Sequence, residues 1–319
     1  SEFAKMAVVI VTAFILSKGR TEDGANPSAF KTIMIIAGTI CAIILPENFS
    51  TAFLLFGVVF LMMYIGHVPL KKLGILVGSL FSVAIVGIAF LIITKDIDVP
   101  FMHRFDTWRT RIEKFVSNEE IAASEFDTDK DGQVAHARIA VATSHIIGKG
   151  PGNSVQRDFL SQAFSDFIFA IVIEELGLLG GAFVVFLYIC LLIRVGRIAK
   201  RCNRSFPAFL VIGIGLLLVT QAVFNMMVAV GLAPVTGQPL PLISRDGTST
   251  IINCVYIGML LSVSRYTASI EQEELLRQAE VAPEKSAAVL LAEAVLAENQ
   301  AQSAEEPTSE VLNSDSEFE

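Results

Sequence analysis

Seven apolar runs, each close to the length needed to cross a bilayer, decide what this chain can fold into. They lie at about 3–17, 31–46, 50–66, 73–94, 167–193, 207–230 and 249–264. A hydrocarbon core about 30 Å thick needs roughly 20 apolar residues in a helix, and lipid offers no partner to an unpaired backbone group. Since 53% of all residues are apolar, the sequence predicts an all-α, polytopic membrane helix bundle.

Lysine and arginine residues indicate which side of such a bundle faces the cytoplasm. Bases flank or fill the connections at 18–31, 71–72 and 194–204, whereas the short connection at 46–50 has none. The three basic connections fall on one side when seven spans alternate. We therefore expect a large extracellular loop at 95–165 and a second outer loop at 231–248.

The acidic character of the chain belongs to its C-terminal segment. Residues 271–319 hold 13 of the 32 acids but two of the 24 bases, so the rest of the chain carries a net charge of +3 although the whole carries −8. This composition predicts a membrane domain at 1–265 and an acidic, mostly disordered cytoplasmic tail at 266–319. Because the chain does not begin with Met, we expect it to be a fragment that lacks earlier spans.

Asp166 stands where a Gly-rich polar loop meets the apolar run 167–193. Carboxylates at a membrane boundary are costly, so they are candidates for proton transfer, ion binding or recognition of a polar head group. Asp166 can act as a general base facing the outer surface, or it can simply cap the first turn of a helix. Both interpretations predict an ionised side chain, because a helix N-terminus favours negative charge.

Two further features lie near Asp166 in the sequence. Glu174 and Glu175 are placed two turns deeper in the same run, where they are expected to hydrogen-bond a neighbouring helix or to shape a polar cavity. The segment GKGPGNS, residues 148–154, does not match the P-loop pattern. Lys149 and the backbone N–H groups of this segment can hold a pyrophosphate or a sugar, or the glycines can serve only tight turns.

The two outer loops carry two more signals. The segment 231–250 is apolar but rich in Pro and Gly, which predicts an ordered re-entrant cap over the site that Asp166 faces. The segment DTDKDG, residues 127–132, matches the start of an EF-hand, but the twelfth position is Arg138 where a bidentate Glu is required. A true EF-hand is therefore excluded, and a weak divalent cation site stays open.

Four motifs occur in a fixed order along the membrane part. They are SEFAK at 1–5, PENFSTA at 46–52, GKGPGNSVQRDFL with SDFIFAIVIEELG between 148 and 177, and GLAPVTGQPLPLIS at 231–244. In this order they resemble the SEDS family, the shape, elongation, division and sporulation proteins, over about residues 1–265. The GNSVQ motif at 152–156 and the C-terminal tail resemble the division branch, FtsW, more than the elongation branch, RodA. Because the family has ten spans, the resemblance implies a chain that lacks the first three.

The resemblance implies an enzyme, a peptidoglycan glycosyltransferase that polymerises lipid II at the outer face of the bacterial cytoplasmic membrane. It further implies work at the division septum with a class B penicillin-binding transpeptidase and other division proteins, and no nucleic-acid partner. Asp166 matches the family's essential aspartate, expected to deprotonate the acceptor sugar hydroxyl. We expect substrate binding by Lys5, Arg104, Gln133, Lys149, Ser154, Glu174 and Ser244. No metal ligand and no certain cofactor is expected beyond a possible divalent cation.

Two other functions remain open, namely a transporter that flips lipid II across the membrane and a scaffold that recruits division proteins. The sequence also departs from the family at three places. Arg245 and Asp246 stand where the family usually has two glycines, Ser144 and His145 lie near a usual Gly-Gly, and His136 replaces a glutamine. If the glycines adopt a positive φ, side chains at these positions are expected to strain the backbone.

Overall fold

The computed structural model describes residues 2–18, 27–79, 82, 131–160 and 163–304. Every regular element in these ranges is helical, which confirms the predicted all-α class. The chain divides into two compact units, residues 1–264 and residues 265–319. The first unit holds the candidate site.

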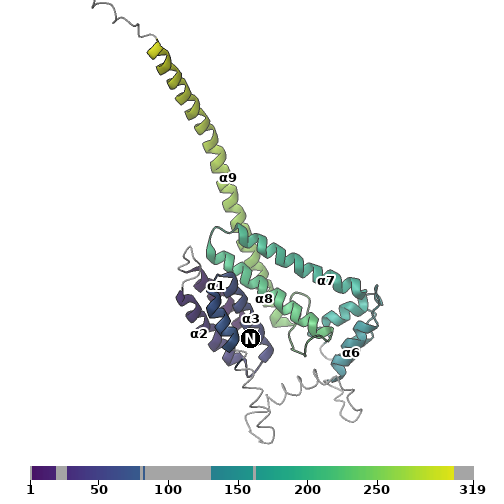
Figure 1. The fold of residues 1–319 in the computed structure, drawn as a ribbon. Coiled ribbons are helices and arrows are strands. Elements are labelled where there is room, and N and C mark those ends of the chain that lie inside the picture. The colour runs from purple at the N-terminus through teal and green to yellow at the C-terminus, as the bar shows by residue number, and fades with distance from the viewer. Residues whose placement is uncertain (1, 19–26, 80–81, 83–130, 161–162, 305–319) are drawn as a thin grey trace, which may run out of the picture. The chain divides into compact units, whose positions relative to one another are not determined.

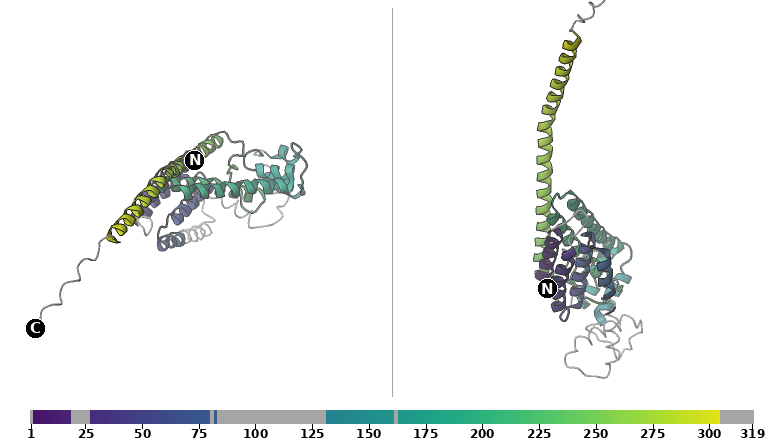
Figure 2. Two further views of the ribbon diagram at one scale, coloured as in Figure 1. Left: turned by 90° about the horizontal axis from the view of Figure 1, so that it is seen from above. Right: turned by 60° about the vertical axis from the view of Figure 1, so that its left-hand side comes forward.

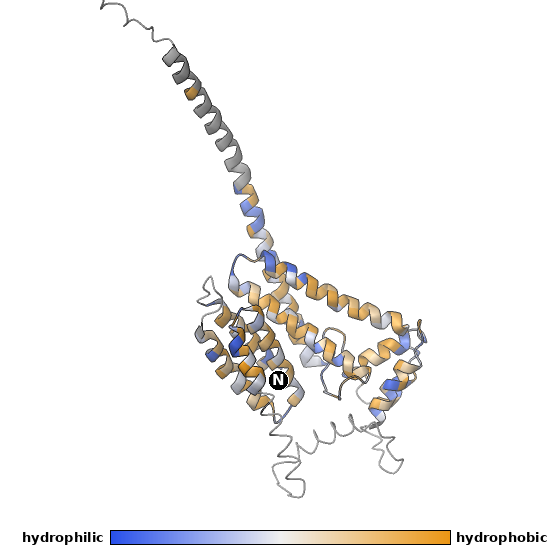
Figure 3. Ribbon diagram, viewed as in Figure 1, coloured by the Kyte–Doolittle hydropathy of each residue, from blue (hydrophilic) through white to orange (hydrophobic). Residues whose placement is uncertain are grey.

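Helices cover six of the seven predicted apolar runs. They are α1 (Glu2–Ser17), α2 (Pro27–Ile44), α3 (Phe49–Ile65), α7 (Ile168–Arg201), α8 (Ser205–Ala229) and α9 (Gly247–Ala304). The remaining run, 73–94, lies largely outside the described residues, which show helix at 70–79. Within the described part, α7, α8 and residues 247–277 of α9 are long and apolar enough to cross a membrane, and α2 and α3 are shorter apolar helices. Figure 3 shows the apolar character of α7 and α8 along their length.

Helix α8 lies at the centre of the first unit, with α1, α2 and α3 on one side and α6 (Asp131–Ala142) on the other (Figure 1). The three N-terminal helices pack side by side, as the right-hand view of Figure 2 shows. One apolar core joins them to α8 through fully buried side chains such as Val59 and Leu218. A second core joins α6 and the start of α7 to the end of α8 around Phe167 and Ala222.

Aromatic contacts connect the ends of the helices that carry the basic residues. Lys18 lies 6.0 Å from the ring centroid of Phe14, and Phe14 packs edge-on against Phe206 at the start of α8. Lys72 lies 5.8 Å from the ring centroid of Phe30, near the start of α2. These contacts agree with the alternation of spans on which the predicted orientation rests. Which end faces the cytoplasm stays a prediction.

The predicted disorder of the acidic tail is wrong for residues 266–304, because α9 continues through them as a helix to Ala304. Residues 305–319 lie outside the described part of the chain. The segment 271–304 is rich in Ala, Glu, Leu and Gln, which are strong helix formers. It also follows a helix that already exists, so its extension needs no new nucleus. Charge and low hydrophobicity predicted disorder, whereas local helix propensity decided the outcome.

Candidate functional site

Helix α7 is interrupted at Gly177, where the backbone adopts φ 74° and ψ −174°. This conformation is essentially restricted to glycine. The helix therefore consists of a first piece, Ile168–Leu176, and a second piece, Leu178–Arg201. Glu174 and Glu175 lie within the helix that covers the apolar run, as predicted, but the interruption places both in the last turn of the first piece.

The Gly-rich loop satisfies the backbone groups that the interruption leaves without helical partners. Broken helices expose carbonyl groups at one end and N–H groups at the other, and each needs a partner when it is buried. The four bonds run from Lys149 N to Glu174 O at 3.0 Å, Gly150 N to Glu175 O at 2.8 Å, Leu178 N to His145 O at 3.2 Å and Leu179 N to Ile146 O at 3.3 Å. The loop at 145–150 thus fills the gap in α7.

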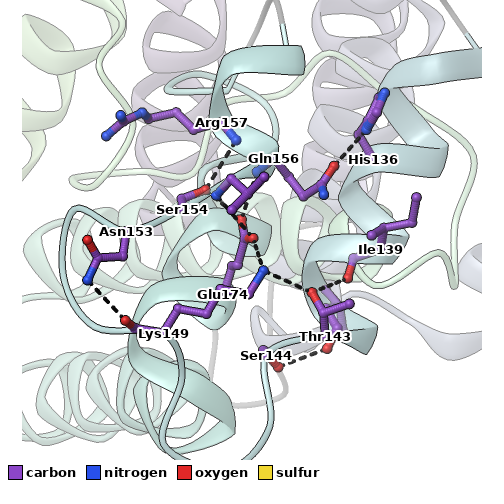
Figure 4. Close-up of polar contacts among 12 residues, drawn as sticks. His136, Ile139, Thr143, Ser144, Lys149, Asn153, Ser154, Gln156, Arg157 and Glu174 are labelled. Atoms are coloured by element: carbon purple, nitrogen blue, oxygen red, sulfur yellow. Dashed lines mark hydrogen bonds and ion pairs between the residues drawn. The ribbon is translucent and has the colours of Figure 1, made fainter.

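The Glu174 side chain is fully buried and holds the same loop (Figure 4). Its carboxylate accepts hydrogen bonds from Lys149 Nζ at 2.6 Å, from Ser154 Oγ at 2.5 Å and from the backbone N–H groups of Val155 and Gln156 at 3.3 Å. The expected partner was a neighbouring helix, and the observed partner is the loop. Three predicted substrate-binding residues, Lys149, Ser154 and Glu174, therefore lie together and bind one another.

Replacement of Glu174 by glutamine should lower the free energy of unfolding by about 1.5–3 kcal/mol, the usual value of hydrogen bonds to a charged group. Glutamine keeps the shape of the side chain but removes the charge that pairs with Lys149. The melting temperature in detergent measures the change. Glu175→Gln serves as the matched control, since this neighbouring side chain is half-buried and the loop bond to residue 175 uses its backbone oxygen. Equal melting temperatures for the two variants would contradict the assigned role.

Asp166 lies just before α7 and does not cap it. The N-cap residue is Phe167, which makes no side-chain capping bond, and Asp166 Oδ1 instead accepts a hydrogen bond from Ser165 Oγ at 3.1 Å. Burial raises the pKa of Asp166, the Ser165 bond opposes that shift, and the charge of Asp246 adds to it. A helix N-terminus was expected to favour the charged form of this carboxyl, but burial acts in the opposite direction and has the larger effect on its pKa.

The loop at 231–246 is ordered and lies on Asp166, which confirms the predicted cap. The side-chain amide of Asn225 donates to the backbone oxygens of Asp166 at 2.7 Å and of Gln238 at 2.8 Å. A Cβ atom placed on Gly237 would lie 3.6 Å from Asp166 Oδ2. Ser244 Oγ donates to the backbone oxygen of Ser165 at 2.6 Å. Ser244, a predicted substrate ligand, therefore ties the cap to the segment that carries Asp166.

Lys5 is fully buried at the start of α1 and is connected to the same cap. Its ammonium group pairs with Glu2 at 2.5 Å and donates to Gln221 Oε1 at 3.1 Å. The amide of Gln221 in turn donates to the backbone oxygen of Pro239 at 3.0 Å. A buried charge needs such compensation. Through Gln221, Lys5 is thus connected by hydrogen bonds to Pro239 of the cap.

The predicted site residues thus form two groups. Lys149, Ser154 and Glu174 gather at the interruption of α7, and Lys5, Asp166 and Ser244 gather around the cap. Gln133 lies on α6, and Arg104 lies outside the described residues.

Sequence reasoning missed Gln221 and Asn225, although amide side chains inside the apolar run 207–230 were a usable signal. Polar groups within a span are costly and are kept for a partner. The partner here is the cap, whose backbone oxygens both amides bind. These two residues therefore position the cap over Asp166.

The departures from the family motifs have different structural consequences. Arg245 and Asp246 are absent from the residues with positive φ, so the expected backbone strain does not arise there, whereas His145 has φ 54°. The segment 127–130 of the EF-hand-like motif lies outside the described residues, and Asp131 and Gly132 begin α6. Among the side chains that the structure describes, no group of three or more His, Cys, Asp and Glu residues is arranged to hold a metal ion.

Comparison with known proteins places these features in a family. The family model for FtsW, RodA and SpoVE, described as a cell cycle protein, matches residues 1–269. A probable peptidoglycan glycosyltransferase FtsW from Hahella chejuensis is 33% identical over 279 residues, which cover 86% of this chain and 66% of that protein. The protein of the same description from Thioalkalivibrio sulfidiphilus is 30% identical over 274 residues, covering 84% and 63%. The chain thus spans slightly less than two thirds of the length of these relatives.

Two solved structures share the fold. A structure reported for the coordination of polymerization and crosslinking by a peptidoglycan synthase complex gives a TM-score of 0.62 at 22% identity, over 83% of this chain and 69% of that chain. A variant of the rod shape determining protein RodA from Thermus thermophilus gives 0.53 at 22% identity, over 83% and 65%. With three helices of membrane-spanning length among its described residues, the chain is a multi-pass membrane protein. It belongs to the FtsW, RodA and SpoVE family of cell cycle proteins.

Proposed function

We propose that this protein is a peptidoglycan glycosyltransferase that polymerises lipid II into glycan strands at the outer face of the bacterial cytoplasmic membrane. The names of its relatives support this activity. The single observation that carries the proposal is the half-buried carboxyl group of Asp166 beneath an ordered cap. Its raised pKa makes Asp166 a stronger base than an exposed aspartate.

In the proposed reaction, Asp166 accepts the proton of an acceptor sugar hydroxyl. The hydroxyl oxygen attacks the anomeric carbon of the growing chain and forms the new glycosidic bond. The bond from that carbon to the pyrophosphate breaks, and undecaprenyl pyrophosphate leaves with the electron pair. In this scheme Arg104, Gln133 and Lys149 bind substrate directly, while Lys5, Ser154, Glu174 and Ser244 hold the cap and the loop in place.

The proposed setting is the division septum, where the protein works with a class B penicillin-binding transpeptidase and other division proteins. Two observations support it. The relatives at about 30% identity carry the name FtsW, and the fold matches a chain from a peptidoglycan synthase complex. Such a pairing would bring polymerisation and cross-linking to one place on the membrane.

Purified protein supplied with lipid II tests the activity directly. The protein is reconstituted with its transpeptidase partner, and glycan strands are resolved by length on a gel. Strands longer than the starting disaccharide are the expected result. Movement of lipid II between the leaflets of a vesicle without any polymer would favour a transporter instead, and neither activity would favour a scaffold.

The pH dependence of the reaction should follow Asp166. A protonated carboxyl cannot accept the hydroxyl proton, and burial raises the pKa of this group. The polymerisation rate should therefore decline on acidification at a higher pH than an exposed aspartate would give. Initial rates at saturating lipid II across a pH series measure this. A rate that stays constant down to the usual range of an exposed aspartate would contradict the assignment.

A further inference from the structure

The start of α9 lies alongside the segment that carries Asp166. Arg245 N donates to the backbone oxygen of Phe164 at 2.8 Å, and Ser244 Oγ donates to the backbone oxygen of Ser165 at 2.6 Å. These two bonds fix residues 244–246 against residues 164–166. Asp246 itself is held at the first turn of α9, because its backbone oxygen accepts bonds from the N–H group and the hydroxyl of Thr250. The backbone at Asp246 is therefore fixed beside the segment that carries Asp166.

Asp246 brings a second negative charge to Asp166. Repulsion from its carboxylate raises the pKa of Asp166, and the same carboxylate interacts electrostatically with Lys5 on α1. Thr51 on α3 and the amides of Gln221 and Asn225 on α8 contribute uncharged groups. Further charged groups are Glu2, which pairs with Lys5 on α1, and Arg138 on α6, which lies beside Gly231 at the start of the cap. Of the charged groups that the structure describes, Asp246 is the one that acts on Asp166.

We propose that Asp246 is a positioning residue of the reaction site, whose carboxylate acts through Asp166 and makes it a stronger proton acceptor. This inference rests on the proposed function. A second negative charge makes loss of the proton from Asp166 less favourable, so Asp166 holds a proton more firmly than it would without Asp246. When the acceptor hydroxyl binds, the increased proton affinity of Asp166 favours transfer of the hydroxyl proton to it. The positive charge of Lys5 offsets part of the negative charge of Asp246.

The test is the pH profile of polymerisation for the Asp246→Asn variant. Asparagine matches aspartate in shape, and the bonds to residue 246 that hold α9 use its backbone oxygen, so folding should be preserved. Removal of the charge should shift the acid limb of the profile to lower pH. It should also lower the plateau rate several-fold, because a weaker base accepts the proton less readily. Asp246→Glu should restore part of both effects.

Glu47→Gln is the matched control, since it removes a carboxylate from the exposed turn between α2 and α3. This variant should leave the acid limb in place. An unshifted acid limb in Asp246→Asn, with normal polymer from the parent protein, would overturn the role of Asp246 and leave the proposed function standing. Absence of polymer from the parent protein would overturn the proposed function itself. Infrared difference spectra of the Asp166 carboxyl, taken against Asp166→Asn, then test the coupling to Asp246 without any turnover.

Discussion

Replacement of Asp166 by asparagine should reduce the rate of glycan polymerisation by at least about 100-fold, the lower end of what general-base catalysis contributes. Asparagine has the same shape and can still accept the bond from Ser165. The backbone oxygen of residue 166 keeps its bond from Asn225. The cap and the start of α7 should therefore be unchanged, and only the capacity to accept a proton is lost. Initial rates with purified lipid II measure the effect.

The control is the same chemical change at Asp158, whose side chain is 75% exposed and pairs with Arg157 at 3.4 Å. Asp158→Asn should polymerise at the rate of the parent protein. The melting temperature of Asp166→Asn should stay equal to or exceed that of the parent, since burying a neutral amide costs less than burying a charge. Normal polymerisation by Asp166→Asn would show that Asp166 is not the general base. It would favour a transporter or a scaffold as the function of this protein.

The long apolar helices were predictable because the requirement that creates them is local, whereas α6 in the outer loop was not predicted. A span must be apolar over its own length, so hydropathy alone found α1, α2, α3, α7, α8 and α9. The ends of the elements were less certain where propensity competes with polarity. The extension of α9 beyond residue 265 is the clearest example, since its Ala- and Glu-rich sequence is polar and yet strongly helical.

The candidate site was predictable only in part. Asp166 could be found because a carboxylate beside an apolar run is costly and must have a reason. The direction of its pKa shift could not be predicted, because that shift depends on burial beneath a cap that lies about 70 residues later in the sequence and on the charge of Asp246. Hydropathy averages over a window, so it also concealed the interruption at Gly177. The pairing of that interruption with the loop at 145–150 is a tertiary contact that no local pattern reports.

Replacement of Gly177 by alanine should destabilise the protein by more than about 4 kcal/mol, a range reserved for disruption of a special backbone conformation or a buried network. A Cβ atom at this position would overlap the carbonyl oxygen of Ile146 and lie 2.5 Å from the amide nitrogen of Gly148. Both are backbone atoms that cannot rotate away. The loop must therefore leave the gap in α7, and the buried N–H and C=O groups there lose their partners. Thermal unfolding in detergent and the yield of monodisperse protein measure the loss.

Two other glycines separate the causes of that effect. Gly152 has φ +83° and open space around it, so Gly152→Ala should cost only the left-handed strain of about 1–2 kcal/mol. Gly196 lies in the helical second piece of α7 with nothing within 4 Å, so Gly196→Ala should stabilise the protein by about 0.5–1 kcal/mol. If Gly177→Ala melts no lower than Gly152→Ala, the loop does not depend on close backbone contact. The large expected difference follows because the interruption and the loop each supply the hydrogen bonds that the other lacks.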